Sequence, residues 1–224
     1  MINFMAFLDS PLRKMSSVYR YSGLPTVHRE NLAEHSFWVA YVSWYLAMDW
    51  QQYYKGTDTH YIVQWNILFT GALAHDNEET VTGDFPRPFK YVTPELRAAI
   101  EVASVAAFEK LASDFSRALC PRDEAVDNHL IFDGALRYAW SKAKDLQTIE
   151  GVIVSLADAF SVLFFSMEEN RLGNKMMKYE LDSLLEYLHS LPEKVDDMVI
   201  RPWLKHHIGE LIALYMKIYN GEVM

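Results

Sequence analysis

The chain has 224 residues, a length that fits one domain and leaves little room for a second. Half of its residues are hydrophobic and 14% are aromatic, which supplies a sizeable core and excludes a disordered chain. The net charge of −9 argues against a general nucleic-acid-binding protein, which usually carries a basic face.

Helical stretches separated by short breaks follow one another along the first half of the chain. The first is expected over residues 3–19, and residues 22–25 (SGLP) break it. The second starts near Asn31 and carries many aromatic and apolar residues. A third is expected over residues 59–79. Residues 82–88 contain one Gly and two Pro, so they are not expected to form regular helix.

The second half of the chain continues this pattern. Pro94 suits the first turn of a helix, and Gly173 suits the end of the most apolar one. The helices expected here cover residues 94–119, 123–144, 148–169, 176–190 and 203–219. The breaks between these predicted helices are short, so neighbouring helices are expected to pack on one another.

No segment alternates convincingly with a period of two, and 9 Gly and 8 Pro are too few for a many-stranded β fold. The sequence therefore predicts an all-α fold. We expect one helical domain over residues 1–224, in which helices at about 176–220 are appended to a core of about residues 10–170.

The expected compartment is the cytoplasm. Cys120 is the lone cysteine, so it has no partner for an internal disulfide or a zinc motif. The N-terminal residues lack the basic region of a signal peptide. The longest apolar stretch, residues 152–167, is short for a bilayer and carries Asp158, so we interpret it as a buried helix and expect no membrane partner.

His75 and Asp76 lie together near the end of an otherwise apolar predicted helix. Glu79 follows His75 by four residues and would share its helix face. A bare His-Asp pair is more often a core histidine beside a surface acid. Three such groups just before a Gly/Pro segment favour a functional site.

Asp158 stands in the middle of the most apolar stretch of the chain. An ionised carboxylate there faces a large desolvation penalty unless a cation or strong hydrogen-bond donors meet it. A structural ion pair with Arg or Lys is one solution. A metal ion is the other, provided that further ligands exist.

His35 follows Glu34 early in the second predicted helix, beside aromatic core positions. Alone it would more often be a core histidine than a ligand. With His75, Asp76 and Asp158 it completes a set of nitrogen and oxygen donors on three helices. Such a set suits one divalent ion and leaves its identity open among Mn²⁺, Co²⁺, Fe²⁺, Ni²⁺, Zn²⁺ and Mg²⁺.

The order His35, His75-Asp76, Asp158 resembles the H…HD…D signature of the HD phosphohydrolase superfamily. Longer segments resemble the bacterial 5′-deoxynucleotidases of this superfamily over roughly residues 10–170. They are Arg20, residues 29–36 (RENLAEHS), residues 74–90 (AHDNEETVTGDFPRPFK) and residues 157–159 (ADA). The HDxxExxTGDxP part is highly specific.

The resemblance implies a single HD-domain helical bundle that hydrolyses deoxynucleotides. It implies that one divalent cation is bound by His35, His75, Asp76 and Asp158. A divalent cation polarises a phosphoryl group and helps to supply a nucleophile near neutral pH, which fits these residue types without the analogy.

The resemblance also implies roles for four further residues. Glu79 and Asp84 would stand beside the scissile phosphate as an acid/base pair, and either could protonate the leaving oxygen. Arg20 and Lys90 would meet phosphate oxygens, for which a planar guanidinium is well suited. Plainer roles stay open, because Asp84 could cap a turn after Gly83 and Lys90 could be solvated.

Tyr21 marks a departure from these nucleotidases. In them a Trp usually follows the Arg equivalent to Arg20 and packs on the sugar. We expect Tyr21 to take that place and to contact the substrate. Its different size and polar tip leave the preferred sugar and base open.

The leading interpretation is a 5′-nucleotidase that acts on deoxynucleoside monophosphates. A deoxynucleoside triphosphate triphosphohydrolase, such as the phage-type enzymes that hydrolyse dATP, would share the same ligand set. A non-catalytic nucleotide-sensing module would be expected to lack Glu79 and Asp84, and both are present. A cyclic-dinucleotide phosphodiesterase would be expected to carry extra metal ligands, which we do not find in the sequence. If the chain were only a helical interaction protein, the four separate matches to the nucleotidases would have to be coincidental.

The expected partners follow from this interpretation. The substrate is a small-molecule deoxynucleotide, and no nucleic acid is expected. By resemblance we expect a homodimer or a larger homo-oligomer, for which the many aromatic residues leave surface available.

Overall fold

The computed structural model describes residues 11–90, 92–119 and 126–219. In these ranges the chain forms helices and no strand, which confirms the all-α class. The α-helices are α2 (Leu32–Tyr53), α3 (Trp65–Ala74), α4 (Glu79–Thr82), α5 (Arg87–Lys90), α6 (Pro94–Leu119), α7 (Val126–Ala143), α8 (Ile149–Arg171), α9 (Lys178–Ser190) and α10 (Ile200–Tyr219). Short 3₁₀ helices are η1 (Pro11–Ser17), η2 (Thr59–Tyr61) and η3 (Leu191–Lys194).

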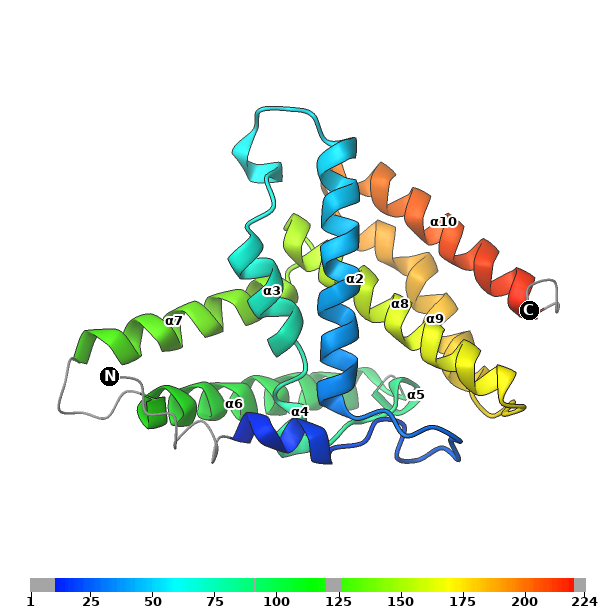
Figure 1. The fold of residues 1–224 in the computed structure, drawn as a ribbon, viewed down its shortest axis with the longest axis horizontal. Helices are drawn as coiled ribbons and strands as arrows, with labels where there is room; N and C mark the ends of the chain where they lie inside the picture. The colour runs from blue at the N-terminus through cyan, green and yellow to red at the C-terminus, as the bar shows by residue number, and fades with distance from the viewer. Residues whose placement is uncertain (1–10, 91, 120–125, 220–224) are drawn as a thin grey trace.

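Helix α8 is the centre of the arrangement. It packs against α2, α3, α7, α9 and α10. In Figure 1, α2 crosses in front of it, with α6 and α7 to one side and α9 and α10 to the other. The helices that bear the predicted ligands therefore meet in the middle of the molecule.

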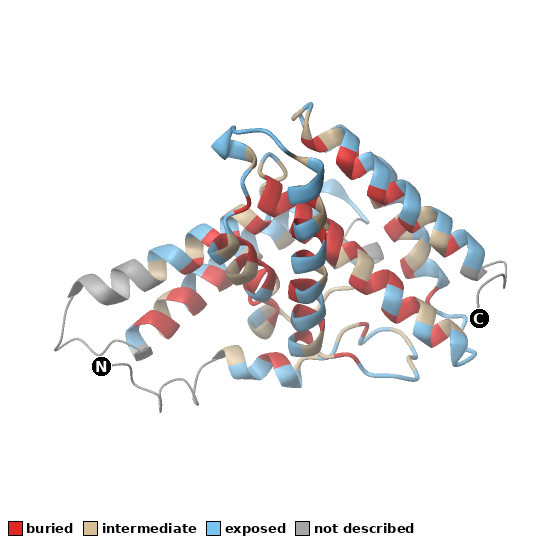
Figure 2. Ribbon diagram, turned by 45° about the horizontal axis from the view of Figure 1, so that its top comes forward, coloured by how far each residue is buried: buried red, intermediate tan, exposed pale blue. Residues whose placement is uncertain are grey.

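The main core contains residues of α2, α3, α8, α9 and α10, so the C-terminal helices share it. Trp50 of α2 and Trp203 of α10 are fully buried and meet edge to face, with ring centroids 5.4 Å apart. A smaller cluster lies between α6 and α7 around Phe108 and Trp140. Figure 2 shows buried positions concentrated along the inner faces of the helices.

Helix α8 has the length and hydropathy of a membrane span, but 78% of its most apolar window is buried inside the fold. The prediction of a buried core helix is thus confirmed. Its start is set by Thr148, whose side chain accepts the N–H of Gly151. The predicted starts near Asn31 and at Pro94 are confirmed as well, and the Asn31 side chain caps α2 by accepting the N–H of Glu34.

The first predicted helix, over residues 3–19, is wrong in its described part. Residues 11–17 form the 3₁₀ helix η1, and residues 3–10 lie outside the described residues. Pro11 has no N–H and disfavours the α-helix that would have to pass through it.

The third predicted helix, over residues 59–79, is wrong at its start. Only η2 and a bend precede α3, which begins at Trp65. Side chains engage the backbone here: Asp58 accepts the N–H of His60 at 2.9 Å. Glu150 of α8 accepts the N–H of Gln64 at 2.7 Å. Contacts of this kind compete with helical hydrogen bonds, and one of them comes from a distant helix.

The same predicted helix is also wrong at its end. Helix α3 ends at Ala74, and residues 75–78 form a turn before α4 begins at Glu79. The N–H of Asn77 bonds to the carbonyl of Ala74, and that of Glu79 to the carbonyl of Asp76, both three residues back. The Gly/Pro segment that follows is irregular over residues 83–86, after which α5 forms one short helical turn.

Candidate active site

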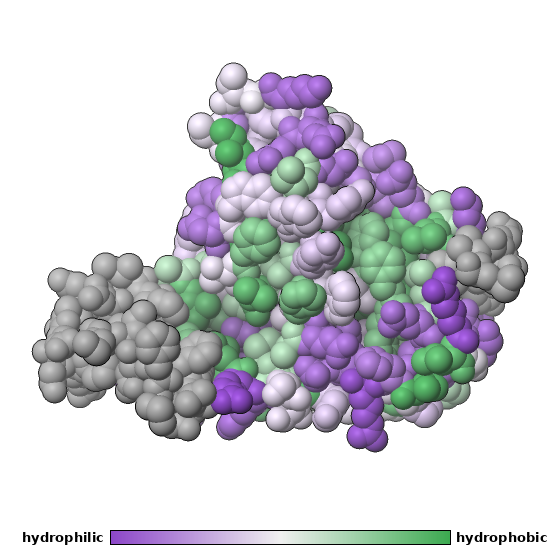
Figure 3. Space-filling view, viewed as in Figure 1, coloured by the Kyte–Doolittle hydropathy of each residue, from purple (hydrophilic) through white to green (hydrophobic). Residues whose placement is uncertain are grey.

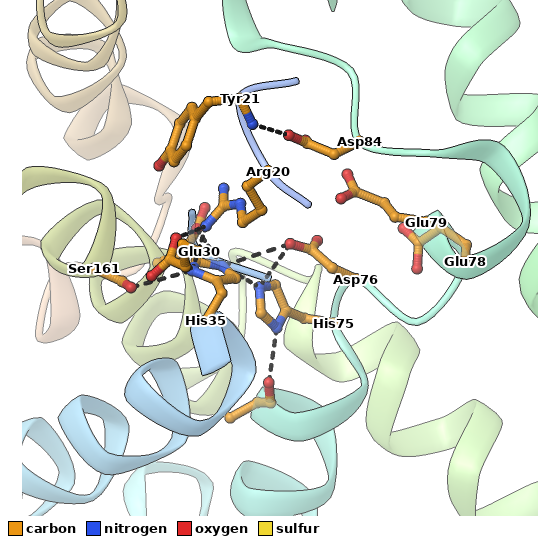
Figure 4. Close-up of polar contacts among 12 residues, drawn as sticks. Arg20, Tyr21, Glu30, His35, His75, Asp76, Glu78, Glu79, Asp84 and Ser161 are labelled. Atoms are coloured by element: carbon orange, nitrogen blue, oxygen red, sulfur yellow. Dashed lines mark hydrogen bonds and ion pairs between the residues drawn. The ribbon is translucent and has the colours of Figure 1, made fainter. Parts of the chain in front are cut away.

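Four segments bring the predicted metal ligands together (Figure 4). His35 lies in the first turn of α2, which its Asn31 cap begins. His75 is the C-cap residue of α3, and Asp76 follows it in the turn. Asp158 lies in the middle of α8. Both histidines are buried, and the two aspartates are partly open.

The four side chains face one another across short distances. The Nε2 atoms of His35 and His75 are 3.3 Å apart. Asp76 Oδ2 lies 3.1 Å from His75 Nε2 and 3.6 Å from His35 Nε2. Asp158 Oδ1 lies 3.2 Å from His35 Nε2. Ligands that each stand about 2.1 Å from one zinc-like ion are roughly 3–3.5 Å from each other, so these spacings fit a single first-row cation.

The orientation of His75 also fits a ligand. Its Nδ1 lies 2.7 Å from the carbonyl oxygen of Ala72, which accepts only from a protonated nitrogen. In the neutral ring Nε2 therefore carries the lone pair and faces the other ligands. A donor set of two imidazoles and two carboxylates suits a divalent ion, and donor atoms of His35, His75 and Asp158 all lie within 4.8 Å of one another.

A second layer of polar groups surrounds the far side of His35. Its Nδ1 lies 3.1 Å from Ser161 Oγ and 3.9 Å from Glu30 Oε2. Arg20 Nη1 contacts both this nitrogen and the Glu30 carboxylate. Because a guanidinium only donates, the contact with Arg20 gives Nδ1 the acceptor role here. Ser161 Oγ is within reach to accept from a protonated Nδ1, an arrangement that would leave Nε2 free for a cation.

The charges of this cluster respond to burial and to one another. Burial, aided by Arg20, lowers the pKa of His35 to about 4. Burial acts in the same sense on His75, but the Asp76 carboxylate outweighs it and raises the pKa of His75 to about 9. Burial opposes ionisation of Asp158, yet the hydrogen bond and charge of His35 hold its pKa below the ordinary range. The carboxylates are ionised and the centre attracts positive charge.

Glu79 and Asp84 point into the space beside Asp76, as Figure 4 shows. Glu79 is the first residue of α4 and is 5% exposed. Its Oε1 accepts from Lys90 Nζ at 2.8 Å. Burial and the Asp76 carboxylate raise the pKa of Glu79 to about 8, although the Lys90 ammonium acts against them. Glu79 therefore holds a proton more readily than an ordinary glutamate does.

Backbone geometry places Asp84. Gly83 has φ 79° and ψ 162°, a region that is essentially restricted to glycine, and turns the chain after α4. Asp84 Oδ2 then accepts the backbone N–H of Tyr21 at 2.9 Å. Tyr21 itself has a left-handed backbone, with φ 56°. The loop before α2 and the loop after α4 are thus joined at the site.

The ring of Tyr21 is 4% exposed and stacks on Phe165, with ring centroids 4.7 Å apart. Its predicted contact with a sugar therefore has little side-chain area available and stays a prediction. The backbone N–H of Tyr21 instead contacts Asp84, which residue identity alone does not predict.

Sequence reasoning gave no role to Glu30, Glu78 or Ser161, all three of which are buried near the predicted residues. Ser161 follows Asp158 by three residues on α8, a spacing that signals a shared helix face. Glu34, the residue before His35, faces His28 instead: its Oε1 lies 3.5 Å from His28 Nε2.

A groove of about 970 Å³ lies behind the candidate site, between α2 and α10 and over α8. Its inner end reaches Glu30 and Ser161. Its walls include Trp38, Tyr41 and Phe164. Figure 3 shows hydrophobic side chains gathered on this face beside α2.

Comparison with known proteins identifies similar sequences. A family model described as YfbR-like 5′-deoxynucleotidase matches residues 3–206. A 5′-deoxynucleotidase of Pasteurella multocida is 29% identical over 191 residues, which cover 84% of this chain and 86% of that protein. One of Vibrio parahaemolyticus is 30% identical over 178 residues, which cover 78% of this chain and 82% of that protein.

Solved structures share the fold. An HD-domain phosphohydrolase from Listeria innocua superposes with a TM-score of 0.58 at 23% identity, and covers 92% of this chain and 98% of its own. A protein from Pyrococcus horikoshii gives a TM-score of 0.61 at 17% identity, over 93% of this chain and 99% of its own. At these identities the likeness establishes the helical architecture.

Proposed function

Because the chain belongs to the family of YfbR-like 5′-deoxynucleotidases, we propose that it hydrolyses deoxynucleoside 5′-monophosphates to deoxynucleosides and inorganic phosphate. One observation carries the proposal: a two-histidine, two-aspartate cluster lies beside the two carboxylates expected of a phosphohydrolase. The relatives named above are 5′-deoxynucleotidases. Similarity to them favours neither of the two alternatives, a triphosphohydrolase or a nucleotide sensor.

We propose one divalent cation per chain, bound by His35, His75, Asp76 and Asp158. The short spacings between their donor atoms support a single ion. Such a cation supplies Lewis acidity toward the phosphoryl group. The donor set leaves the choice of ion to measurement.

The chain's own groups would then bind the phosphate and move protons. Arg20 would release Glu30 and bind phosphate oxygens through its planar guanidinium. Lys90 would neutralise the phosphate from the side of Glu79. Both cations would help a chain of net charge −9 to hold a negatively charged substrate.

We assign Glu79 as the proton donor and Asp84 as the proton acceptor. Water attacks phosphorus as the bond from phosphorus to the 5′ oxygen breaks. Asp84 takes the proton from the attacking water, and Glu79 gives its proton to the leaving 5′ oxygen. The raised pKa of Glu79 supports this division of roles, because a donor must be protonated at working pH.

We further propose that the protein forms a homodimer through the outer face of α2. Six large side chains there are between 42% and 67% exposed: Phe37, Trp38, Tyr41, Trp44, Tyr45 and Met48. At about 200 Å² for each such side chain, they expose roughly 600 Å², close to the ~800 Å² that each partner buries in a typical stable interface. These side chains form a ridge beside the groove between α2 and α10, and such a surface can pair with its own copy across a two-fold axis. Light scattering would give twice the chain mass, and a monomer would refute this part.

We also propose that the whole chain works as one HD domain in the cytoplasm, on free nucleotides and not on nucleic acid. The shared core of α2, α8, α9 and α10 supports a single unit. The net charge of −9 supports small substrates over nucleic acid.

The decisive experiment is a panel of mono-, di- and triphosphates, each as ribonucleotide and deoxyribonucleotide, with identification of the products. We expect phosphate release from monophosphates, with kcat/KM about 10-fold or more higher for dAMP than for AMP. Release of intact triphosphate would identify the alternative triphosphohydrolase. Tight nucleotide binding without turnover, in metal-loaded protein, would identify a sensor.

A further inference from the structure

The turn that carries Asp76 and Glu79 holds a second glutamate, to which the proposed mechanism gives no task. Glu78 is 3% exposed, so its carboxylate is buried in the protein. It does not contact the four predicted ligands through any described hydrogen bond or ion pair. A buried carboxylate beside two site residues calls for an explanation, because burial of an unpaired charge is strongly unfavourable.

Both oxygens of Glu78 have partners on α7. Oε1 forms an ion pair with Lys144 Nζ, just beyond the end of that helix. Oε2 accepts the indole N–H of Trp140 at 3.1 Å. The Lys144 ammonium also lies 4.5 Å from the centre of the Trp140 ring. Glu78 therefore connects the turn to α7 by two charge-assisted contacts.

One partner of Glu78, Trp140, is itself held in place by packing, whereas the Lys144 side chain is partly exposed. Trp140 stacks on Phe108 of α6, with ring centroids 4.2 Å apart and ring planes 9° from parallel. Phe108 is fully buried. The contact of Glu78 with Trp140 thus ends in the packed cluster between α6 and α7 and not in a mobile surface group.

The turn needs such support because regular helix does not fix it. Helix α3 ends at Ala74 and α4 begins at Glu79, with only three-residue hydrogen bonds between them. Just before the turn, α3 approaches α7 closely at Gly71. A Cβ added there would lie 2.9 Å from the carbonyl oxygen of Ala139, so a larger residue would force the helices apart.

We propose that Glu78 is a positioning residue of the active site. Through Trp140 and Lys144 it fixes the turn so that Asp76 faces the cation and Glu79 faces the substrate. It touches neither, so it is not a catalytic residue. This inference rests on the proposed function, in which Asp76 binds the metal and Glu79 donates a proton.

The test compares Glu78→Gln and Lys144→Met with the double variant that carries both changes. In Glu78→Gln the amide oxygen can still accept from Trp140, but the amide N–H₂ faces the Lys144 ammonium. In the double variant that clash between donors is gone. Three quantities are measured: steady-state kinetics on dAMP, Co²⁺ binding followed by its visible absorption, and thermal unfolding.

We expect Glu78→Gln to lower kcat about 10-fold and to weaken Co²⁺ binding about 10-fold, since partners that orient ligands usually matter by 10- to 100-fold. KM for dAMP should change by less than about threefold, because Arg20 and Lys90 are untouched. The Co²⁺ spectrum should also change, since Asp76 is displaced. The double variant should recover most of the loss in each measurement.

Arg137→Met is the matched control. Arg137 ties α7 to α6 at another point, where its Nη2 donates to Glu109 O and Ser113 Oγ, both at 2.9 Å. Its loss should lower the unfolding temperature and leave kcat, KM and the Co²⁺ spectrum unchanged. If Glu78→Gln behaves in the same way, Glu78 is merely structural and the proposal is wrong.

Two further outcomes separate this proposal from the one on which it rests. If the wild-type protein hydrolyses no nucleotide, the proposed function fails, while Co²⁺ titration still reports whether Glu78 orients Asp76. If Glu78→Gln does not fold, Lys144→Met carries the test with the same expected losses. Unchanged Co²⁺ binding and kcat in Lys144→Met would then overturn the proposal.

Discussion

Glu169 of α8 anchors the loop that carries Arg20 and Glu30 toward the site. It is fully buried, and its carboxylate accepts the backbone N–H groups of Val27 at 2.8 Å and His28 at 2.6 Å. Asn174 donates to the same oxygen as Val27. We predict that Glu169→Gln destabilises the protein and that the effect depends on pH.

The magnitude follows from the two oxygens. The glutamine oxygen can replace the one that accepts from Val27, but the amide N–H₂ then faces the N–H of His28. One hydrogen bond to a charged group is lost and one donor is left without an acceptor, which costs roughly 1.5–3 kcal/mol. For a chain of this size that corresponds to a fall of about 3–12 °C in Tm.

The pH dependence has a defined sign. Burial alone would raise the pKa of Glu169, but hydrogen bonds from Asn174, His28 and Val27 hold it below its ordinary value of 4.5. A depressed pKa in the folded state contributes stability above pH 4.5, and this contribution is lost as pH falls through the folded-state value. Glutamine does not titrate, so the gap between wild type and variant should close below about pH 4.5.

Thermal unfolding of both proteins at pH 7 and at steps down to about pH 3 measures this gap. Reversibility and coincident transitions by two probes are needed before Tm is compared. A Tm within 1 °C of wild type at pH 7 would refute the role of Glu169 as an anchor. A gap that stays constant as the pH falls would refute the contribution of its charge.

Three further predictions concern the site itself. Asp158→Ala should lose the bound cation, and added metal should raise the Tm of wild type but not of the variant; full activity of the variant after chelation would contradict this. Glu79→Gln and Asp84→Asn should keep the metal and lose about 10² or more in kcat, and turnover within threefold of wild type for both would remove them from the mechanism. Arg20→Ala should weaken binding of dAMP far more than that of deoxyadenosine, whereas equal losses for the two would make Arg20 structural.

The parts of the fold that follow local chemistry could be predicted from the sequence. Thr148 and Asn31 are strong N-caps and Pro94 is a good first-turn residue, so the starts of α8, α2 and α6 were expected close to where they lie. The apolar run of residues 152–167 predicted a buried helix because it is short for a bilayer and carries Asp158.

The errors arose where a distant side chain decides the local structure. The bond from Gln64 to Glu150 joins residues 86 positions apart, and no pattern near Gln64 reveals it. In the turn at residues 75–78, Glu78 likewise contacts Trp140, 62 positions away. Helix propensity favours continuing α3 through both places, and tertiary contacts override it.

The predicted ligands could be named because their residue types and order are distinctive, but their geometry could not. The sequence gives no distance between His35 and Asp158, which the structure brings to 3.2 Å. It also gave no means to see that the Tyr21 ring is buried on Phe165 while its N–H holds Asp84. Backbone contacts of this kind leave no signature in residue identity.

The position of Asp158 in α8 determines when the proposed cation could bind during folding. His35 and Asp158 are 123 residues apart in sequence (158 − 35), so their meeting closes most of the chain into one loop. A nascent chain cannot assemble the full ligand set before α8 has left the ribosome. Because the unfolded chain holds no preformed site, the proposed cation would bind after α2 has collapsed onto α8, and it would then oppose the unfolding of both helices. Refolding should therefore be insensitive to metal in its early phase and sensitive only in its last one.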